Sequence, residues 1–340
     1  MTAFADVAVT AHVVVDHPSA VHHAASLAKD AARAAGLDAT TVERAAVLTT
    51  ELAENLLRHA VEGAVYVQRR PADSGAGGID VTAVDRGPGM ASPDRAMVDG
   101  YSTIGTLGSG MGAAQRLADE LTLRTLPGLG TLICARFHAP GAAPAAADLG
   151  LVCLPLRGEK LCGDSAAVVD DPGGRTAVVV DGLGHGAEAA GASAEAVRVF
   201  RENPDRPLPE LLTTMDRALR GTRGAAVSLV RLRPGTVEHC GVGNVRLLLV
   251  GHAGIAARDT GQPGVVGWNM PRPRTRTLPM AEDSAAVLHS DGIAPRWADS
   301  APPFLLGLPP RLLAAALGHG HRSARDDATA LVSGAARRNT

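Results

Sequence analysis

Two groups of residues in the N-terminal half have the types and spacing needed to bind a nucleotide. Glu51 and Asn55 are four residues apart, so both side chains project from one face of a helix. The turn Asp85-Arg86-Gly87-Pro88-Gly89 follows a strand-like segment. Its aspartate can accept a hydrogen bond from an exocyclic amine, and Gly87 and Gly89 let a planar ring approach the backbone. Such a turn alone is a weak signal, because turns favour these residues anyway.

A third group is the glycine-rich run from Gly105 to Gly112, which leads directly into a helical segment. Successive backbone N–H groups of such a loop, with a helix N-terminus behind them, form a cradle for an anion. The only lysines are Lys29 and Lys160, and neither lies in a G-x-x-x-x-G-K-[ST] loop, so the phosphates must be held without lysine. The expected cradle residues are Gly105, Gly108, Gly110, Met111 and Gly112.

Aspartates recur beside strand-like segments in the C-terminal half. Each lone Asp-Gly is more often a turn than a metal ligand. Carboxylates converging from adjacent strand ends, however, give the open, oxygen-rich geometry that Mg²⁺ or Mn²⁺ prefers. No set of histidines and cysteines competes for zinc. The aspartates stand in Gly163-Asp164, Asp181-Gly182-Leu183-Gly184-His185-Gly186, Ser290-Asp291-Gly292 and Asp326-Asp327-Ala328-Thr329.

The elements expected around these residues divide the chain into two domains of α+β type. In the first, two helices and two pairs of strands indicate a two-layer arrangement. In the second, consecutive strands with grouped helices indicate an antiparallel sheet or sandwich with helices outside. The expected domains are 1–138 and 151–335, joined by a Pro- and Ala-rich linker over 139–150. The expected helices are 19–35, 40–60, 113–120, 187–200 and 208–220, and the expected strands are 65–70, 79–85, 121–126, 131–137, 151–156, 176–181, 225–232, 245–250, 285–289 and 329–332.

Composition narrows the function classes. The chain has 340 residues and a formal net charge of −2, which suits two or three domains and disfavours a nucleic-acid binder that relies on phosphate contacts. The four cysteines show no C-x-x-C spacing, so reduced thiols are expected. Neither a signal peptide nor a long apolar span is readable. We therefore expect a soluble, cytoplasmic protein that binds neither nucleic acid nor membrane.

In order and spacing, the N-terminal groups resemble the Bergerat-fold (GHKL) ATPases, and closely the anti-sigma-factor serine kinases and switch kinases typified by RsbW and RsbT. The resemblance spans about residues 13–137 and includes Gly130-Thr131 in the final hairpin. It implies a two-layer α/β sandwich that binds ATP with Mg²⁺. In it, Asn55 would coordinate Mg²⁺, Glu51 would act as general base on a substrate serine, Asp85 would read the adenine amine, and Thr131 would support the adenine through water.

The C-terminal aspartates resemble the metal-dependent, type 2C-like serine/threonine phosphatases of the SpoIIE/RsbX branch, over about residues 151–333. The resemblance implies a β-sandwich flanked by helices and two Mn²⁺ or Mg²⁺ ions that activate water without a covalent intermediate. Asp181 would bridge both metals, with the Gly182 carbonyl as a further ligand. Asp164 would orient the metal-bound water. Asp291 and Asp326 match ligands of the second metal, although the sequence leaves the choice between Asp326 and Asp327 open. For His185, phosphate contact and a structural role in the turn both stay open.

Together the two resemblances predict a bifunctional regulator of bacterial stress or sigma-factor signalling, with a serine/threonine kinase module and a phosphoserine/phosphothreonine phosphatase. Implied partners are STAS-type anti-sigma antagonists or stressosome proteins, with a sigma factor or a downstream phosphatase as further partners. In the alternative, only the phosphatase is an enzyme, and the first domain is a nucleotide-dependent protein-binding module that acts as an anti-sigma factor or an activator without transferring phosphate. Glu51 discriminates between them, because a binding module does not need it.

Overall fold

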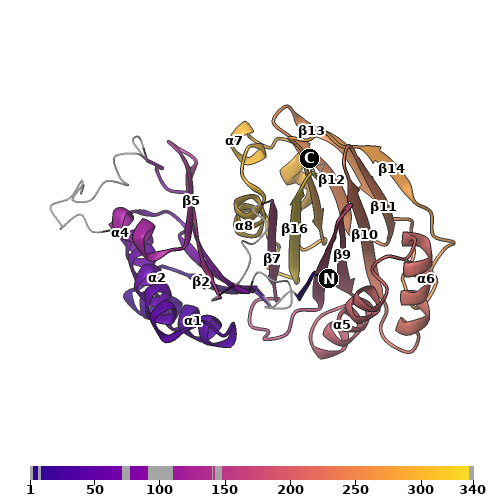
Figure 1. Cartoon of the computed structure of the whole chain (residues 1–340), viewed down its shortest axis with the longest axis horizontal. Helices are drawn as coiled ribbons and strands as arrows, with labels where there is room; N and C mark the ends of the chain where they lie inside the picture. The colour runs from indigo at the N-terminus through magenta and orange to yellow at the C-terminus, as the bar shows by residue number, and fades with distance from the viewer. Residues whose placement is uncertain are drawn as a thin grey trace. The chain divides into compact units, whose positions relative to one another are not determined.

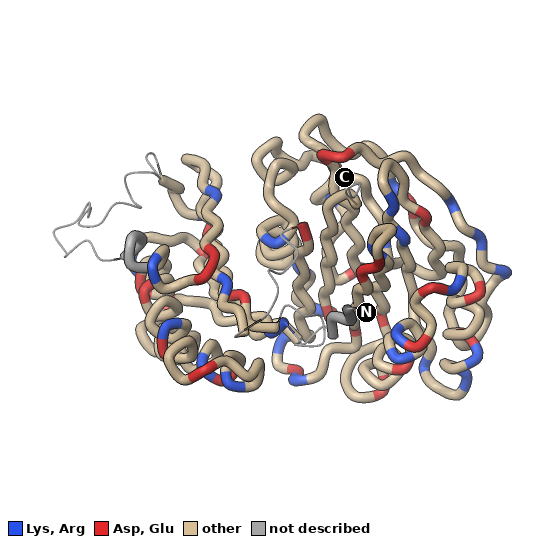
Figure 2. Tube along the Cα trace, viewed as in Figure 1, with Lys and Arg blue, Asp and Glu red and all other residues tan. Residues whose placement is uncertain are grey.

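The computed structural model describes residues 3–6, 9–70, 77–90, 110–139, 141 and 148–336, without side chains for 3–6 and 110–113. The chain divides into two compact units. One is Thr10–Ala145, and the other combines Met1–Val9 with Ala146–Thr340. Figure 1 shows both, and each is described here by itself. Acidic and basic residues are interspersed along both units (Figure 2).

The unit Thr10–Ala145 has two layers. Its sheet has the order β2-β3-β4-β6-β5 with every neighbouring pair antiparallel. Its helices lie together on one face of that sheet (Figure 1), with an Ala- and Val-rich core between the layers. The elements in chain order are β2 (Ala11–Val14), α1 (Pro18–Ala34), α2 (Ala39–His59), β3 (Ala64–Arg70), β4 (Gly78–Asp85), α4 (Gly110–Leu117), β5 (Glu120–Leu126) and β6 (Gly130–His138).

Helix α2 carries the first candidate site, and its boundaries follow from local chemistry. Asp38 caps its start, since the Asp38 carboxylate accepts from the backbone N–H of Thr41 at 3.0 Å. The predicted apolar stripe, which includes Leu48, Leu52 and Leu56, is buried against the sheet. This burial leaves the neighbouring row that contains Glu51 and Asn55 at the margin of the core.

The second unit is a sandwich of two antiparallel sheets, as the sequence predicted. The sheets have the orders β1-β8-β9-β10-β11-β14 and β13-β12-β15-β16-β7. The strands are β1 (Ala3–Asp6), β7 (Leu149–Leu154), β8 (Asp164–Asp171), β9 (Gly174–Gly182), β10 (Ala225–Arg233), β11 (Thr236–Val242), β12 (Arg246–Gly251), β13 (Gly254–Thr260), β14 (Arg276–Pro279), β15 (Ala285–His289) and β16 (Ala328–Gly334). The helices are α5 (Ala187–Glu202), α6 (Leu208–Leu219), η2 (Pro295–Ala298), α7 (Pro303–Leu306) and α8 (Pro310–Gly320).

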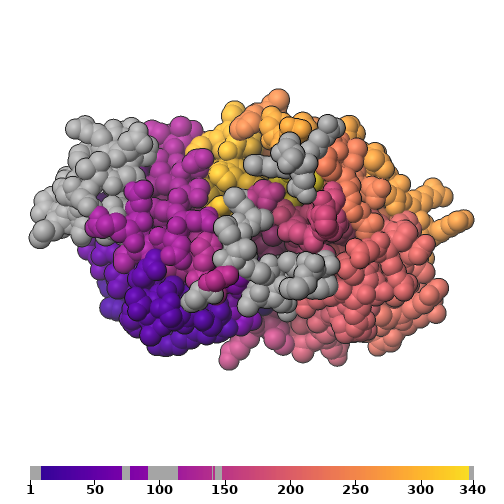
Figure 3. All heavy atoms as spheres, viewed as in Figure 1, coloured from indigo at the N-terminus to yellow at the C-terminus, as the bar shows by residue number. Residues whose placement is uncertain are grey.

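Helices cover both outer faces of this sandwich. Helices α5 and α6 pack on the first sheet through a core that includes Phe200 and Met215, and their outer side chains form part of the surface in Figure 3. Helix α8 packs on β7 and β16 of the second sheet. A separate core that includes Val179 and Leu247 fills the space between the sheets. No helix in the described ranges is long and apolar enough to cross a membrane.

The structure corrects the expected domain boundaries at two places. Residues 3–6 lie within the predicted first domain, but as β1 they pair with β8, with Ala3 opposite Asp170. The predicted linker 139–150 includes Leu149 and Gly150, which belong to β7. The unit Thr10–Ala145 is thus inserted between two strands of the other unit. Sequence patterns missed this because β1 is only four residues long, too short to show a periodicity.

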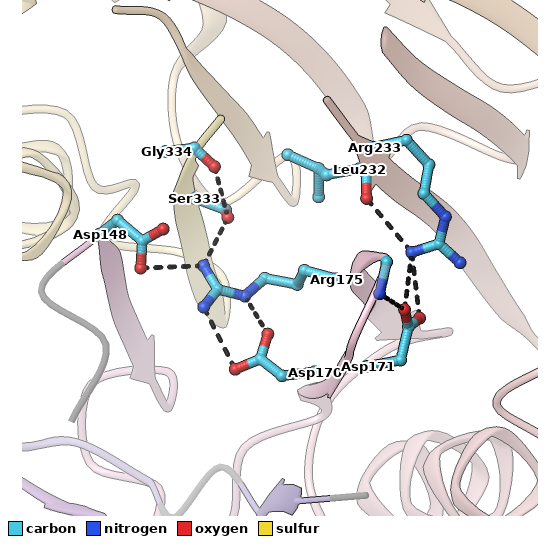
Figure 4. A network of polar contacts seen from close by, with 9 residues as sticks. Asp148, Asp170, Asp171, Arg175, Leu232, Arg233, Ser333 and Gly334 are labelled. Atoms are coloured by element: carbon cyan, nitrogen blue, oxygen red, sulfur yellow. Dashed lines mark hydrogen bonds and ion pairs between the residues drawn. The ribbon is translucent and has the colours of Figure 1, made fainter. Parts of the chain in front are cut away.

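Arg175 joins the two sheets of the sandwich by hydrogen bonds at the β8–β9 turn (Figure 4). Arg175 of β9 donates from Nε to Asp170 at 2.6 Å and from Nη1 to Ser333 of β16 at 2.8 Å. The same Nη1 lies 3.3 Å from Asp148, just before β7. A nearly buried guanidinium needs such partners because an unpaired charge in the interior is costly. Asp148 is therefore held at a defined place where the predicted linker ends.

A second polar chain joins the two sheets. The Ser228 hydroxyl of β10 lies 2.8 Å from Nε2 of His239, whose Nδ1 lies 2.9 Å from the Asp259 carboxylate of β13. Arg276 of β14 pairs with the other oxygen of Asp259 at 2.8 Å. Ser228 and His239 are almost fully buried. A neutral imidazole satisfies both partners, because Nδ1–H donates to Asp259 while Nε2 accepts from Ser228.

This buried histidine predicts acid sensitivity. Burial lowers the pKa of His239 below its ordinary value of 6.5, although the Asp259 hydrogen bond opposes that shift. The unfolded chain therefore binds a proton more readily than the folded chain. The contribution of His239 to stability is complete above pH 6.5 and is lost as the pH falls below it, by up to about 1.4 kcal/mol for each pH unit.

The difference in the free energy of urea unfolding between pH 7.5 and pH 5.5 should shift in His239→Gln, because the variant loses less stability than the unmodified chain, relative to pH 7.5, when the pH falls to 5.5. His252→Gln, at an exposed histidine of the same unit, is the matched control and should leave the difference unchanged. An identical pH dependence in the His239→Gln variant and the unmodified chain would contradict this role.

Candidate functional site

On α2, the structure places the two predicted residues side by side at the margin of the core. Glu51 and Asn55 are both half-buried. Within the described residues, neither side chain makes a hydrogen bond or an ion pair, whereas the neighbouring Glu54 is paired with Arg58 at 2.5 Å. A half-buried carboxylate and amide without protein partners can bind a ligand and a cation.

The Asp85 turn packs against the end of α2. The N–H of Arg86 donates to the Val61 carbonyl at 3.0 Å, and a Cβ at Gly87 would come within 2.9 Å of the Val61 nitrogen. Gly89 has a φ of +71°, and a Cβ there would lie 2.3 Å from the Leu126 carbonyl oxygen. The spacing of the Asp-x-Gly-x-Gly turn therefore follows from close backbone contacts on both sides.

Asp85 itself is half-buried at the end of β4, opposite Thr131 of β6. Burial raises the pKa of its carboxyl, and backbone N–H groups of Gly87 and Thr131 oppose that shift; the Gly87 hydrogen bond is 2.7 Å. Thr131 is buried, and its Oγ1 lies 3.1 Å from that of Thr125. The structure thus places Asp85 and Thr131 opposite each other, in a position partly shielded from water.

The predicted phosphate cradle is described only in part. Gly105 and Gly108 lie outside the described residues. Gly110, Met111 and Gly112 form the first turn of α4, so the helix begins inside the run that the sequence predicted as the loop before it. The role of this segment in binding phosphate stays a prediction.

In the second unit, the predicted aspartates meet at one edge of the sandwich. Asp164 of β8 and Asp181 of β9 are directly opposite in the antiparallel register, so their side chains share one face. Asp164 is 4% exposed, and its Oδ2 accepts from the Ser290 hydroxyl at 2.7 Å. Ser290 Oγ in turn accepts from the Thr329 N–H at 3.0 Å. These contacts connect both sheets at the candidate site.

The geometry separates the roles of the two consecutive aspartates. Asp327 is buried, and its carboxylate accepts from the N–H of Leu156 at 2.7 Å and from the N–H of Gly163 at 2.9 Å. Both of its oxygens are therefore engaged with the backbone. Asp326 is half-buried and accepts from the N–H of Asp327. This arrangement leaves Asp326 as the candidate metal ligand and gives Asp327 an anchoring role.

Glycines bring the loops of this edge into contact. A Cβ at Gly182 would lie 2.4 Å from the Ala189 carbonyl oxygen, and one at Gly292 would lie 1.8 Å from the Asp327 carbonyl oxygen. The exposed Asp291 accepts from the Asn244 side chain at 2.7 Å. The exposed side chain of His185 lies 3.5 Å from Glu159, so the structure gives it a partner in a neighbouring loop.

Electrostatics at this edge favour a divalent cation. Burial and the neighbouring carboxylates raise the pKa values of Asp164 and Asp181, and burial and Asp291 raise that of Asp326. A cation would offset the repulsion between carboxylates that adds to the effect of burial. Among the described residues, no three His, Cys, Asp or Glu side chains gather tightly enough to ligate one ion alone. The donors that the structure brings together here are carboxylate oxygens, the ligand type that a hard cation such as Mg²⁺ prefers.

Sequence reasoning missed three contributors. The sequence pattern gave no role to Ser290 beyond the turn with Asp291, and none to Asn244. Both hold a carboxylate through a contact between residues distant in the chain. The anchoring role of Asp327 was also missed, because an Asp-Asp pair does not reveal which carboxylate accepts backbone hydrogen bonds. The only sequence signal for Ser290 is that it is a small polar residue directly before a candidate metal ligand, Asp291.

Comparison with known proteins agrees with both units. Residues 14–137 match the histidine kinase-like ATPase domain family, and residues 171–337 match the stage II sporulation protein E (SpoIIE) family. The serine/threonine-protein kinase RsbT of Bacillus subtilis (strain 168) is 39% identical over 95 residues, which are 27% of this chain and 71% of RsbT. The phosphoserine phosphatase RsbX of the same organism is 25% identical over 142 residues, which are 41% of this chain and 71% of RsbX.

A solved structure from work on the bacterial stressosome is 30% identical, with a TM-score of 0.51, and covers 56% of this chain and 98% of its own. Fold and site define a GHKL-type ATPase unit combined with a type 2C-like phosphatase unit. The chain belongs to the RsbT-type histidine kinase-like ATPases through the first unit. Its second unit matches the SpoIIE family and is similar to RsbX.

The two consecutive aspartates allow a direct test. Asp327→Asn leaves one backbone N–H without its acceptor, which we expect to cost about 1–3 kcal/mol and to lower the melting temperature of the chain. Asp326→Asn should keep the melting temperature measured in EDTA but lose the increase that Mn²⁺ produces. Thermal unfolding with Mn²⁺ and with EDTA distinguishes them. If Asp326→Asn kept the Mn²⁺ effect and a folded Asp327→Asn chain lost it, the assignment would be reversed.

Proposed function

We propose that this chain is a bifunctional, partner-switching regulator. Its second unit removes phosphate from phosphoserine or phosphothreonine, and its first unit transfers phosphate from ATP to a serine or threonine hydroxyl. The observation that carries the proposal is the set of aspartates at one edge of the sandwich, with Asp164 and Asp181 opposite each other and Asp326 free of the backbone contacts that occupy Asp327.

In the phosphatase unit, Asp181, the Gly182 carbonyl, Asp291 and Asp326 would hold two Mn²⁺ or Mg²⁺ ions. When bound, these cations would neutralise the phosphate charge and activate water for in-line attack. Ser290 holds Asp164 so that its carboxylate can orient the attacking water and accept a proton. Asn244 fixes Asp291 in the same way. No nucleophilic side chain is required.

In the kinase unit, Asn55 would hold Mg²⁺ and Asp85 would bind the adenine amine, with Thr131 beside it and Gly87 and Gly89 giving the ring access to the backbone. The glycine-rich run from Gly105 to Gly112 would surround the phosphates. Glu51 then needs only to orient the substrate hydroxyl and accept its proton, because positioning and charge neutralisation lower most of the barrier to phosphoryl transfer.

The names of the relatives suggest the partners. RsbT is a serine/threonine kinase, RsbX is a phosphoserine phosphatase, and the 30%-identical structure comes from stressosome work. We propose STAS-domain anti-sigma antagonists or stressosome proteins as substrates, in cytoplasmic stress or sigma-factor signalling. A sigma factor or a downstream phosphatase is a further possible partner. Opposed activities on one substrate would waste ATP, so we expect different substrates or alternate regulation of the two units.

For the phosphatase, we expect Asp181→Asn in the full chain to reduce phosphate release from a phosphoserine peptide with Mn²⁺ by more than about 100-fold, because the bridging carboxylate is lost. Asp205→Asn, at an exposed aspartate after α5, is the matched control and should keep full activity. Undiminished phosphate release by Asp181→Asn would exclude the two-metal mechanism.

For the kinase, we expect Glu51→Ala to keep ATP binding and to lose phosphorylation of a STAS-domain substrate by about 100-fold or more, because the proton acceptor is missing. Glu54→Ala, on the same helix, is the control. An Asp181→Asn background prevents loss of the product by dephosphorylation. If transfer is unchanged in Glu51→Ala, Glu51 is not the general base. If the unmodified chain binds ATP but transfers no phosphate, the first unit is a nucleotide-dependent binding module instead.

A further inference from the structure

Two buried thiols lie next to each other behind the phosphatase site. Cys153 of β7 and Cys162, in the segment before β8, are 1% and 6% exposed, and their Sγ atoms are 3.5 Å apart. All four cysteines of the chain lie in the described residues, and none forms a disulfide. The other two are Cys134, in the first unit, and Cys240 of β11. The close pair is therefore specific to the segment between β7 and β8, next to Asp164.

This pair is directly connected to the candidate catalytic residues. Cys162 is followed by Gly163, whose N–H donates to Asp327 and whose carbonyl accepts from the N–H of Gly182 at 3.2 Å. Asp164 comes next, and its backbone carbonyl lies 3.6 Å from Sγ of Cys153. A displacement of Cys162 is thus transmitted through a single glycine to the aspartate that Ser290 holds in place.

We propose that Cys153 and Cys162 form a reversible disulfide that inactivates the phosphatase unit. The consequence for activity rests on the proposed function, whereas formation of the bond does not. With a peroxide as oxidant, one thiol sulfur attacks the O–O bond, giving a sulfenic acid and one water. The second thiol sulfur then displaces the hydroxyl as a second water. In sum, two S–H bonds are lost, one S–S bond forms, and the peroxide takes up two electrons and two protons.

The geometry explains why the bond would disturb the site. The Sγ atoms must approach from 3.5 Å to about 2.05 Å. Gly163 has little room to adjust, since even a Cβ there would lie 2.7 Å from Asp327 Oδ2 and 2.9 Å from the Ala189 Cβ. Movement of Cys162 toward β7 would therefore break the Gly163 hydrogen bonds to Asp327 and Gly182, and Asp164 would lose its position.

Oxidation of Cys153 and Cys162 should be slow as long as both thiols stay buried. The hydrogen bond to Cys153 and burial raise the pKa of Cys162 well above its ordinary value, so the reactive thiolate is rare at neutral pH. The oxidant must therefore reach the pair during local opening of the segment before β8. Disulfide formation is expected over minutes to hours rather than seconds.

The test uses the full chain under native conditions. One sample is treated with hydrogen peroxide and another with diamide, a reagent that oxidises pairs of thiols to disulfides. We expect an intact mass lower by about 2 Da, restored by dithiothreitol, and a cross-linked peptide that contains Cys153 and Cys162. Cys153→Ser and Cys162→Ser should not show this product. Cys240→Ser, at another buried thiol of the same unit, is the matched control and should behave like the unmodified chain.

Activity and Mn²⁺ affinity are measured on the same samples. We expect oxidation to reduce phosphate release by at least about tenfold in the unmodified chain and in Cys240→Ser, but not in Cys153→Ser. Four alkylatable thiols after treatment of the unmodified chain would overturn the disulfide, whether or not a variant folds. A disulfide that leaves Mn²⁺ affinity and activity unchanged would overturn the switch. If the reduced chain releases no phosphate, the proposed function fails, while the mass and Mn²⁺ affinity still decide this inference.

Discussion

The phosphatase site depends on the Asp327 carboxylate, which accepts backbone N–H groups from two segments far away in the sequence. Leu156 follows β7, and Gly163 precedes β8, so one side chain at the start of β16 sets the positions of both. A buried charge is acceptable there because both oxygens are hydrogen-bonded. With Asp327 engaged in this way, Gly163 and Asp164 are held opposite Asp181, and the other aspartates can face the same edge. The proposed disulfide would act on this same segment.

At the β8–β9 turn, the two sheets are joined by an arginine and by pairing with an additional strand. Arg175 joins β9 to Ser333 of the second sheet and to Asp148, where the chain enters β7. Strand β1 pairs with β8 near the same turn. The phosphatase fold is therefore completed by residues that precede the ATPase unit as well as by those that follow it.

Much of this organisation was readable from sequence where local chemistry determines it. The helix with Glu51 and Asn55 was predicted to within a residue, because its apolar stripe and its cap are local signals. The Asp85 turn and the Asp181 loop were readable because close backbone contacts demand glycine at fixed places. Strands β1, β2, β8, β11, β13 and β14 were missed. Several of them carry charged or small residues that interrupt an alternating pattern. They form strands because they pair with neighbouring strands of the sheet.

The sequence by itself determined the residue types available for chemistry: an acid and an amide one helical turn apart, a lysine-free glycine loop, and aspartates beside strand ends. The families follow from their order and spacing. The tertiary structure decided which of these residues meet and which only hold others in place. It separated Asp326 from Asp327, gave Ser290 and Asn244 their partners, and brought Cys153 against Cys162. Each of these outcomes depends on contacts between segments far apart in the chain, and such contacts leave no periodic signal in the sequence.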